Sequence, residues 1–325
     1  MREKLLKILR EPVTGATLAL KNAKADGGRI EEGELVSGTG RTYPIVRGIP
    51  RFVPPESYAE SFGFQWNKYR DVQLDSATNA SISRARFDAE AGWTEKELEG
   101  TWCLDAGCGA GRFAEIAASR KPNFVAMDLS SAVEAAKKTL ERYPNADVVQ
   151  ASLFEPPFEP GTFDFVYCIG VIQHTPDPRR AVETVVRLAK PGGQFAMTIY
   201  ARKPWTKLNG KYLLRPITRR LPQKTLLRMI EASMPVLFPA TDVLFRVPLL
   251  GKVARFTIPV ANRVENSGFT REGRYAEAVL DTFDSLSPRY DSPMTWQEVE
   301  SVLNTVPAQR WDFRHRVPIE CVGVR

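Results

Sequence analysis

Three glycines stand at alternate positions in the segment TWCLDAGCGAGRF, residues 101–113. They are Gly107, Gly109 and Gly111, and they follow a short apolar run, which is typical of a strand-to-helix turn that approaches a nucleotide. A dinucleotide-binding turn has the pattern G-x-G-x-x-G, whose last glycine lets the helix and strand pack tightly, but position 112 is arginine. The spacing therefore argues against a pyrophosphate ligand such as NAD.

An acidic residue, Asp105, directly precedes these glycines at the end of the predicted strand. A carboxylate in this position would repel a bound phosphate, whereas it would attract a cationic amino group. We therefore expect a nucleotide-like ligand that is partly cationic.

The run LDAGCGAG, residues 104–111, resembles the cofactor-binding motif of class I S-adenosylmethionine-dependent methyltransferases. Further motifs follow in the family's order: Asp128 ends the run FVAMD, FDFVYCIGVIQHTPDP matches the fourth strand and its loop, and LAKPGGQFAMTIY matches the turn into the fifth strand. The resemblance is strong over roughly residues 101–200 and weaker on both sides. It implies S-adenosylmethionine as cofactor and an α/β fold with a Rossmann-like, seven-stranded, mostly parallel sheet.

The resemblance also implies which residues bind the cofactor. Asp128 matches the family's acidic residue that accepts hydrogen bonds from both ribose hydroxyls. Many relatives carry an aspartate that bonds the adenine amino group where Ser152 stands, and Arg84 or Arg86 could meet the cofactor carboxylate. The expected cofactor-binding residues are Asp105, Gly107, Cys108, Gly109, Gly111, Asp128, Leu129, Ser152, Leu153, Ile169, Arg86 and Trp66.

His174 is the candidate catalytic residue. It stands in VIQHTP at the exit of the predicted fourth strand, where it would point into the cleft above the cofactor sulfonium. An imidazole there could deprotonate a hydroxyl group or orient an acceptor. The alternative is that it shapes the loop and packs on the cofactor, because relatives with varied substrates share a histidine here.

The segment YAESFGFQWNKYR, residues 58–70, is unusually aromatic for a linker. Its aromatic and amide side chains suit a lid over a mostly apolar pocket, or the hydrophobic core of a junction between domains. The acceptor-binding residues expected from this segment and from the later chain are Tyr58, Phe64, Gln65, Tyr200, Asp281 and Tyr290.

Composition limits the class of protein. The chain has 325 residues, of which 43% are hydrophobic, so it can bury at least one large core. Its four cysteines show no CxxC spacing, which predicts neither a disulfide framework nor a thiolate zinc site and fits a reducing cytosol. No run of 18 uncharged apolar residues and no signal-peptide core occur, so we expect a cytoplasmic protein that does not span a membrane.

Four regions are expected along the chain. Residues 1–55 are turn-rich and predict a small β module that ends at Pro54-Pro55, and residues 56–200 form the Rossmann-like core with its aromatic lid segment. Residues 201–292 form an insertion over the acceptor site, and residues 293–325 return to the core as a final helix and a β-hairpin. Within the core, strands are expected at WCLD, NFVAMD, ADVVQA, FDFVYCIG and GQFAMTIY, and Thr295 and Glu298 have the spacing of a capping box.

The first 55 residues resemble the zinc-ribbon-like segment that accompanies some such methyltransferases, in which CxxC pairs bind a structural metal. Here Glu11 and Thr14 stand at the first pair, and only Val36, Ser37, Thr39 or Gly40 at the second. We therefore expect no metal. The module would have to be held by its own hairpins and by docking on the core.

The insertion begins with a basic segment. Residues 201–230 contain nine lysines or arginines and no acidic residue, and the apolar sequence that follows carries scattered basic residues. This combination suits a surface for anionic lipid or a lipid-linked acceptor at the inner membrane surface. An RNA-facing patch and a solvated lid with an apolar underside are the alternatives.

Three functions remain open at this stage. The favoured hypothesis is methyl transfer to a small-molecule or lipid-linked metabolite by in-line displacement. The second is RNA methylation, although the N/D-PP-Y/F tetrad that the family uses for exocyclic amines is missing where CIGVIQ stands. The third is a noncatalytic scaffold that retains the cofactor.

Overall fold

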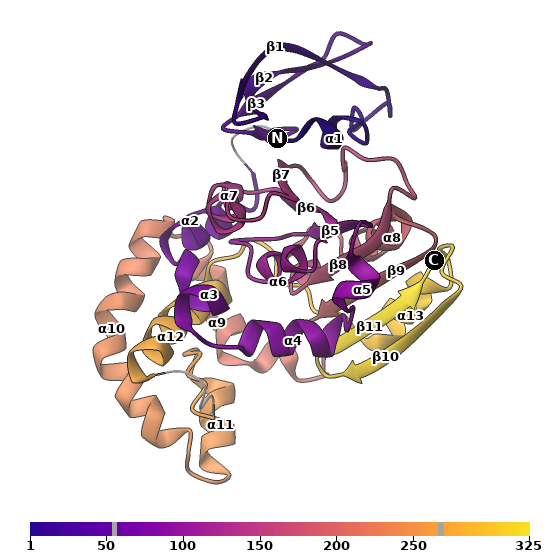
Figure 1. The fold of residues 1–325 in the computed structure, drawn as a ribbon. Coiled ribbons are helices and arrows are strands. Elements are labelled where there is room, and N and C mark those ends of the chain that lie inside the picture. Colours follow the sequence, from indigo (N-terminus) through magenta and orange to yellow (C-terminus); the bar gives the residue numbers. More distant parts are fainter. Residues whose placement is uncertain (54–56, 266–269) are drawn as a thin grey trace.

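The computed structural model describes residues 1–53, 57–265 and 270–325, so the predicted boundary at residues 54–56 lies outside the described residues. A seven-stranded sheet with the order β10-β11-β9-β8-β5-β6-β7 forms its centre (Figure 1). The strands are β5 (Trp102–Ala106), β6 (Asn123–Asp128), β7 (Ala146–Gln150), β8 (Phe163–Ile169), β9 (Ala189–Ile199), β10 (Arg310–Arg316) and β11 (Ile319–Val324).

Five strands of this sheet are parallel, and the C-terminal pair is antiparallel. β5 pairs in parallel with β6 and β8, β6 with β7, and β8 with β9, whereas β11 pairs antiparallel with both β9 and β10. The expected seven-stranded, mostly parallel sheet is thus confirmed. Because β5 lies at the centre and the chain crosses from β7 back to β8 beside it, the carboxyl ends of β5 and β8 flank a topological switch point, where ligands bind in such folds.

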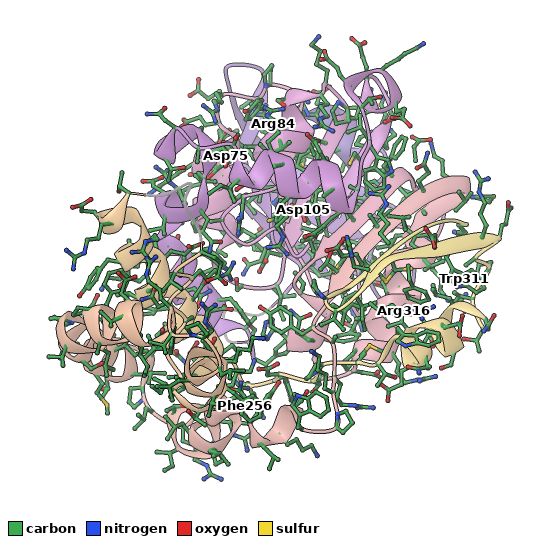
Figure 2. The ribbon with its side chains drawn as sticks, turned by 90° about the horizontal axis from the view of Figure 1, so that it is seen from below. Asp75, Arg84, Asp105, Phe256, Trp311 and Arg316 are labelled. Atoms are coloured by element: carbon green, nitrogen blue, oxygen red, sulfur yellow. The ribbon has the colours of Figure 1, made fainter. Side chains whose placement is uncertain are left out.

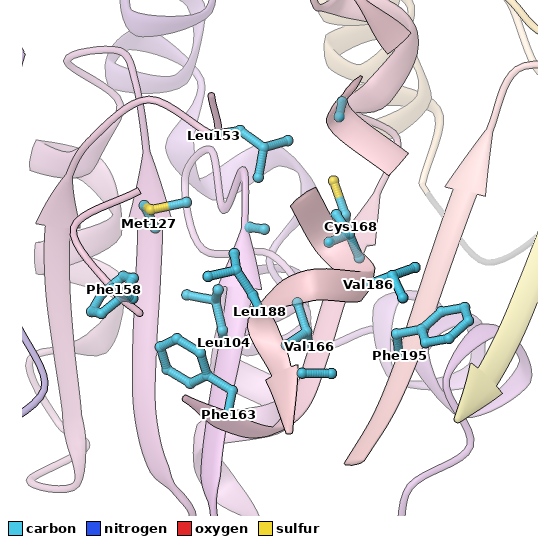
Figure 3. Packing of buried hydrophobic residues seen from close by; sticks show 14 of the residues in the cluster. Leu104, Met127, Leu153, Phe158, Phe163, Val166, Cys168, Val186, Leu188 and Phe195 are labelled. Atoms are coloured by element: carbon cyan, nitrogen blue, oxygen red, sulfur yellow. The ribbon is translucent and has the colours of Figure 1, made fainter. Parts of the chain in front are cut away.

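Helices cover both faces of the sheet. α8 (Pro178–Leu188) and α13 (Trp296–Leu303) pack on one face, and α4 (Ile82–Glu90), α6 (Ala114–Ser119) and α7 (Val133–Leu140) contribute to the core on the other. Leu104 belongs to the first core and its neighbour Cys103 to the second, as the two-residue period of a strand requires. Figure 3 shows the first core around Leu104, Val166 and Phe195.

The predicted capping box is present at the start of α13. The Thr295 hydroxyl accepts from the Glu298 amide at 3.2 Å, and the Glu298 carboxylate accepts from the Thr295 amide at 2.8 Å. Two of the unpaired amides at the helix start are satisfied in this way.

The N-terminal module is a four-stranded antiparallel sheet with a short first helix, and it stands beside the β7 edge of the central sheet (Figure 1). Its elements are α1 (Glu3–Leu6), β1 (Leu18–Asp26), β2 (Arg29–Ser37), β3 (Thr42–Val46) and β4 (Ile49–Pro50). The backbone amide and Nε of Arg2 both donate to Asp147, and the Phe52 amide donates to the carbonyl of Gln150 at 2.8 Å. These contacts dock the module on β7.

A buried carboxylate joins the segment before β1 to the β2–β3 loop and to β3. Glu11 is 1% exposed and accepts hydrogen bonds from the Thr14 amide and hydroxyl, from Nη1 of Arg41 at 2.9 Å and from the Tyr43 hydroxyl at 2.7 Å. Burial opposes its charge, but the bonds from Thr14, Tyr43 and Arg41 prevail and lower the Glu11 pKa to about 2. Among the described residues, no group of three or more His, Cys, Asp or Glu side chains could hold a metal ion.

The insertion is helical and lies on the side of the sheet away from the β10–β11 hairpin (Figure 1). It contains η3 (Thr206–Leu208), α9 (Gly210–Thr218), α10 (Gln223–Leu244), α11 (Leu250–Thr257) and α12 (Arg271–Leu286). The insertion has its own apolar core, which Phe64 and Tyr69 of the aromatic segment join. No helix in the described part of the chain is both long and apolar enough to cross a membrane.

Short elements of the aromatic segment connect the insertion to the central sheet. They are α2 (Glu60–Lys68), η1 (Arg70–Gln73) and α3 (Asp75–Thr78). α2 contacts both α12 and α7. The segment therefore lies between the insertion and the Rossmann-like core.

Candidate functional site

A cavity of about 570 Å³ lies at the carboxyl ends of β5, β6 and β8. Its floor is the glycine turn after β5 and the loops after β6 and β8, and its other walls include residues of α2, η1, α4, β9, α12 and β11. Five residues of the insertion lie on its wall: Arg263, Glu277, Leu280, Asp281 and Asp284. The cavity thus has a nucleotide-binding floor and walls from the two segments expected to cover an acceptor.

The glycine turn can exist only with glycine at its first position. Gly107 has φ +96°, and a Cβ there would stand 2.5 Å from Cγ2 of Val171. At Gly109, with φ +52°, a Cβ would stand 3.1 Å from Nε1 of Trp66. Both amides of Gly107 and Cys108 donate to the carbonyl of Met127, which ties the turn to the end of β6. The glycines therefore let Val171 and Trp66 pack directly on the backbone of the turn, which lines the cavity.

Asp128 lies at the end of β6, next to this turn. Its Oδ2 accepts from the Gly109 amide at 2.9 Å, and its Oδ1 accepts from the amide and hydroxyl of Ser130 at 2.8 and 2.7 Å. Burial raises its pKa from the ordinary value, although these bonds oppose that shift. A carboxylate has about four acceptor sites, so this side chain is oriented by three bonds and still has capacity for a further donor.

His174 ends η2 (Ile172–His174), directly after β8, and is 6% exposed. Its Nδ1 lies 3.2 Å from the backbone carbonyl oxygen of Tyr290. Because a carbonyl only accepts, Nδ1 is the donor, and in the neutral imidazole Nε2 then holds the lone pair. Within the described chain Nε2 has no hydrogen-bond partner, although it is buried and His174 lines the cavity.

Aromatic rings surround this imidazole. The rings of Phe62 and Tyr200 lie 5.1 and 5.6 Å from it, and Tyr58 completes the same part of the wall. Phe62 and Tyr58 come from the aromatic segment and Tyr200 follows β9. His174 therefore faces an aromatic part of the cavity.

Charged residues form a second part of the wall. Arg86 pairs with Glu90, whose carboxylate also accepts from the Thr198 hydroxyl at 2.5 Å. Arg263 pairs with Asp281 at 2.8 Å. Burial raises the pKa of Asp281 to about 6, although Arg263 opposes that shift.

Arg112, which occupies the position of the missing third glycine, also belongs to this charged part. It donates to Oε1 of Gln73 and to the Ser83 hydroxyl, each at 2.9 Å, and Gln73 donates to Asp281 at 3.2 Å. Burial lowers the pKa of Arg112 to about 10. The glycine turn and the insertion are thus joined by one network of hydrogen bonds.

The cavity brings together thirteen of the residues expected to form the site. They are His174, Gly107, Cys108, Gly109, Asp128, Leu129, Leu153, Ile169, Arg86, Trp66, Tyr58, Tyr200 and Asp281. Arg84, in the first turn of α4, is exposed instead, and its amide donates to Asp75 of α3 (Figure 2). Of the two arginines considered for the cofactor carboxylate, only Arg86 lies on the wall.

Six expected residues are not part of the wall: Asp105, Gly111, Ser152, Phe64, Gln65 and Tyr290. Asp105 lies near the middle of the molecule and accepts from the Tyr167 hydroxyl at 3.0 Å, and burial raises its pKa well above the ordinary value (Figure 2). The Ser152 hydroxyl accepts from the Phe154 amide at 3.1 Å. Both side chains are thus engaged by the protein itself.

The other four support the wall from behind. Gln65 donates to Asp284 at 2.8 Å, and the Phe64 ring packs against Phe283 on α12. A Cβ on Gly111 would meet Thr139 of α7 at 3.2 Å, and Tyr290 contributes the carbonyl that orients His174.

Several wall residues were not predicted from the sequence: Gln73, Glu90, Arg112, Thr198, Arg263, Glu277 and Asp284. Arg112 carried a signal, because it interrupts a glycine pattern directly beside the ligand turn. The others come from five different segments, and no local pattern marks them.

The fold and the site together define a Rossmann-like nucleotide-binding domain. The sheet has the strand order given above, the glycine turn follows its central strand β5, and Asp128 ends the neighbouring strand β6. Residues 104–197 match a family model described as Methyltransferase domain. This part of the chain is therefore a class I S-adenosylmethionine-dependent methyltransferase domain, and S-adenosylmethionine is its cofactor.

Curated relatives resemble the same part of the chain. A ubiquinone biosynthesis O-methyltransferase of Pseudomonas aeruginosa (strain UCBPP-PA14) is 33% identical over 129 residues, which are 38% of this chain and 56% of the relative. One of Dechloromonas aromatica (strain RCB) is 29% identical over 171 residues, 51% of this chain and 72% of the relative. The match thus spans just over half of the first relative.

One solved structure with a similar fold is a SAM-dependent methyltransferase from Aquifex aeolicus. The match covers 37% of this chain and 69% of that chain, with 22% sequence identity and a TM-score of 0.32.

Proposed function

We propose that the protein transfers a methyl group from S-adenosylmethionine to a hydroxyl group of a small acceptor, and that His174 removes the hydroxyl proton. The buried, unpartnered Nε2 of His174 at the cavity wall is the observation that carries this proposal. Its partner Tyr290 holds the ring in the tautomer that can accept a proton. A hydroxyl within hydrogen-bond distance of Nε2 would become the nucleophile as its proton leaves.

The wall residues fit the cofactor. Gly107 and Gly109 line the cavity with backbone, and Asp128 has acceptor capacity for a ribose hydroxyl. Arg86 lies on the wall in the middle of α4 and would meet the cofactor carboxylate. When bound, S-adenosylmethionine supplies an electrophilic methyl group on a positively charged sulfur.

The acceptor that suits this cavity is small and has both an aromatic and a polar part. The rings around His174 would hold an apolar or aromatic face, and the charged network at Arg263 and Asp281 would bind a polar substituent. Methyl transfer needs the nucleophile in line with the methyl group, so these two contacts would supply much of the rate by positioning. The names of the similar O-methyltransferases agree with attack by oxygen.

We also propose that the insertion contacts an anionic membrane surface. Residues 201–260 carry twelve basic and two acidic residues, a net charge of +10, whereas the whole chain has +7. α9 contacts both η3 and α11, and eight large apolar side chains in these elements or directly before them are 41–77% exposed. These side chains, named here the apolar patch, are Trp205, Leu208, Leu213, Leu214, Ile217, Leu249, Leu250 and Val253. Basic residues beside apolar ones are the composition of an interfacial surface.

The test of the proposed activity is labelled methyl transfer from S-adenosylmethionine into cell extract, followed by separation into lipid, RNA and small-molecule fractions. The proposal predicts label in a small-molecule or lipid product that mild base does not release, as expected for a methyl ether. Label that nuclease treatment releases would instead favour the RNA alternative. Binding of the cofactor without transfer into any fraction would favour the scaffold alternative.

A further inference from the structure

A second cavity, of about 560 Å³, lies beside the first. Its walls come from the start of α2, the end of α9, the start of α10 and the segment that follows α12. Tyr58 lines both cavities, and the Tyr290 ring on the second wall packs edge-on against Tyr58 at 5.5 Å. One layer of side chains therefore separates the second cavity from His174, which is bonded to the Tyr290 carbonyl.

Three guanidinium groups line this second cavity, those of Arg219, Arg220 and Arg289. Unlike Arg86 and Arg263 in the first cavity, they form no ion pair with any residue that the structure describes. Glu60 is the one carboxylate on the described wall, and like the three arginines it is exposed. The wall has an excess of two positive charges, which favours an anion.

Three residues of this wall carry buried polar atoms without partners. Ser61 and Ser287 belong to the wall and are 3% and 2% exposed. Neither hydroxyl has a hydrogen-bond partner within the described residues, and Oε1 of Gln223, on the same wall, has none either. Buried polar groups in folded proteins are nearly always paired, so three such atoms around one polar cavity indicate a ligand that pairs them.

We propose that this cavity binds a phosphate group, as a phosphomonoester or a phosphodiester. Guanidinium groups recognise phosphate oxygens with pairs of N–H donors, and serine hydroxyls add donors of the right length. A carboxylate ligand has two oxygens, whereas three guanidiniums and two hydroxyls match the larger oxygen set of a tetrahedral anion. Arg219 and Arg220 follow α9, which carries part of the apolar patch, so the phosphate can belong either to a soluble ligand or to a lipid headgroup.

Calorimetric titration at constant ionic strength tests the site, with inorganic phosphate and with glycerol 3-phosphate as probes. The wild-type protein should bind at least one of them saturably, and Arg220→Gln should weaken that binding at least tenfold. Arg228→Gln is the matched control, because Arg228 is an exposed arginine of α10 away from the wall, and it should change the binding less than twofold. An equal loss in both variants would overturn the proposal, because it would show attraction by general charge.

Ser287→Ala provides a second variant that removes one hydroxyl and no charge, and it should weaken phosphate binding severalfold while the melting temperature stays unchanged. A second arm uses phosphatidylcholine vesicles with and without phosphatidic acid. Binding only to vesicles with phosphatidic acid, lost in Arg220→Gln and kept in Arg228→Gln, would assign the phosphate to a lipid headgroup. No binding to either soluble probe or to these vesicles would overturn the proposal. None of these measurements needs methyl transfer, so they test the phosphate site independently of the proposed activity.

Discussion

Nδ1 of His174 lies 3.2 Å from the carbonyl oxygen of Tyr290, a residue 116 positions further along the chain. The bond joins the exit of β8 to the segment that leaves the insertion. The orientation of the candidate base thus depends on a part of the chain outside the Rossmann-like core. The packing of the insertion can in this way also set the orientation of His174.

Asp128→Ala should weaken binding of S-adenosylhomocysteine by at least about tenfold, because a hydrogen bond to a charged group contributes about 1.5 to 3 kcal/mol. Ser152→Ala is the control, since its hydroxyl is bonded to the Phe154 amide and lies off the wall, and it should alter the affinity by no more than about threefold. Isothermal titration measures both. Equal affinities of Asp128→Ala and wild type would remove Asp128 from the cofactor site.

Gly107→Ala should abolish cofactor binding and lower the melting temperature. The substitution forces an alanine to φ +96° and places its Cβ 2.5 Å from Val171. Such backbone strain alone costs about 1 to 3 kcal/mol. Gly38→Ala is a suitable control, because its φ is ordinary and no atom lies within 4 Å of a Cβ there. A stable Gly107→Ala protein with normal cofactor affinity would contradict the described turn.

The Glu11 carboxylate should make the N-terminal module sensitive to acid. Its pKa is about 2 in the folded protein, below the ordinary value of 4.5, so its contribution to stability is complete above about pH 4.5 and is lost as the pH falls toward 2. Glu11→Gln should therefore destabilise the protein at pH 7 by about 1.5 to 3 kcal/mol and flatten this acid dependence.

Urea unfolding of the two proteins between pH 7 and pH 3 measures the difference. Glu32→Gln is the control, because Glu32 forms only an exposed pair with Lys24, which contributes little. A Glu11→Gln protein as stable as wild type at pH 7 would show that the carboxylate does not hold the module.

The apolar patch should bind vesicles that contain phosphatidylglycerol. Leu213→Ser combined with Ile217→Ser removes two exposed side chains of α9 and should reduce cosedimentation severalfold, and added salt should weaken it further. Val13→Ser changes an equally exposed residue in the N-terminal module and should have no effect. The wild-type protein could instead fail to bind vesicles and dimerise as its concentration rises. If the α9 variant then stayed monomeric, the apolar patch would contact a second copy of the chain and not a membrane.

The central sheet could be predicted because its strands carry local patterns. Alternation of residues such as Cys103 and Leu104 between two cores produces continuous apolar runs, and the glycines after β5 mark the ligand turn. The position of Asp128 was predictable as well, because Asp128 ends the apolar run of β6 and the carboxyl ends of parallel strands lie at one edge of the sheet.

The acceptor side of the cavity could not be predicted in this way. Gln73 reaches Asp281 across 208 positions, and Arg112 reaches Gln73 across 39, so the network depends on how the insertion packs. The position of Ser152 after β7 was predicted, but the bonding of its side chain was not. Its hydroxyl accepts a hydrogen bond from the Phe154 amide, and strand patterns do not determine such local side-chain bonds.

Transfer of labelled methyl from S-adenosylmethionine by wild-type protein and by His174→Gln tests the central proposal most directly. The general-base role predicts a rate about 10² to 10⁴ lower in the variant, with an affinity for S-adenosylhomocysteine within about threefold of wild type. The residual rate should rise with pH as the acceptor hydroxyl ionises without help. A variant that transfers methyl groups at the wild-type rate and with the wild-type pH profile would contradict the proposal.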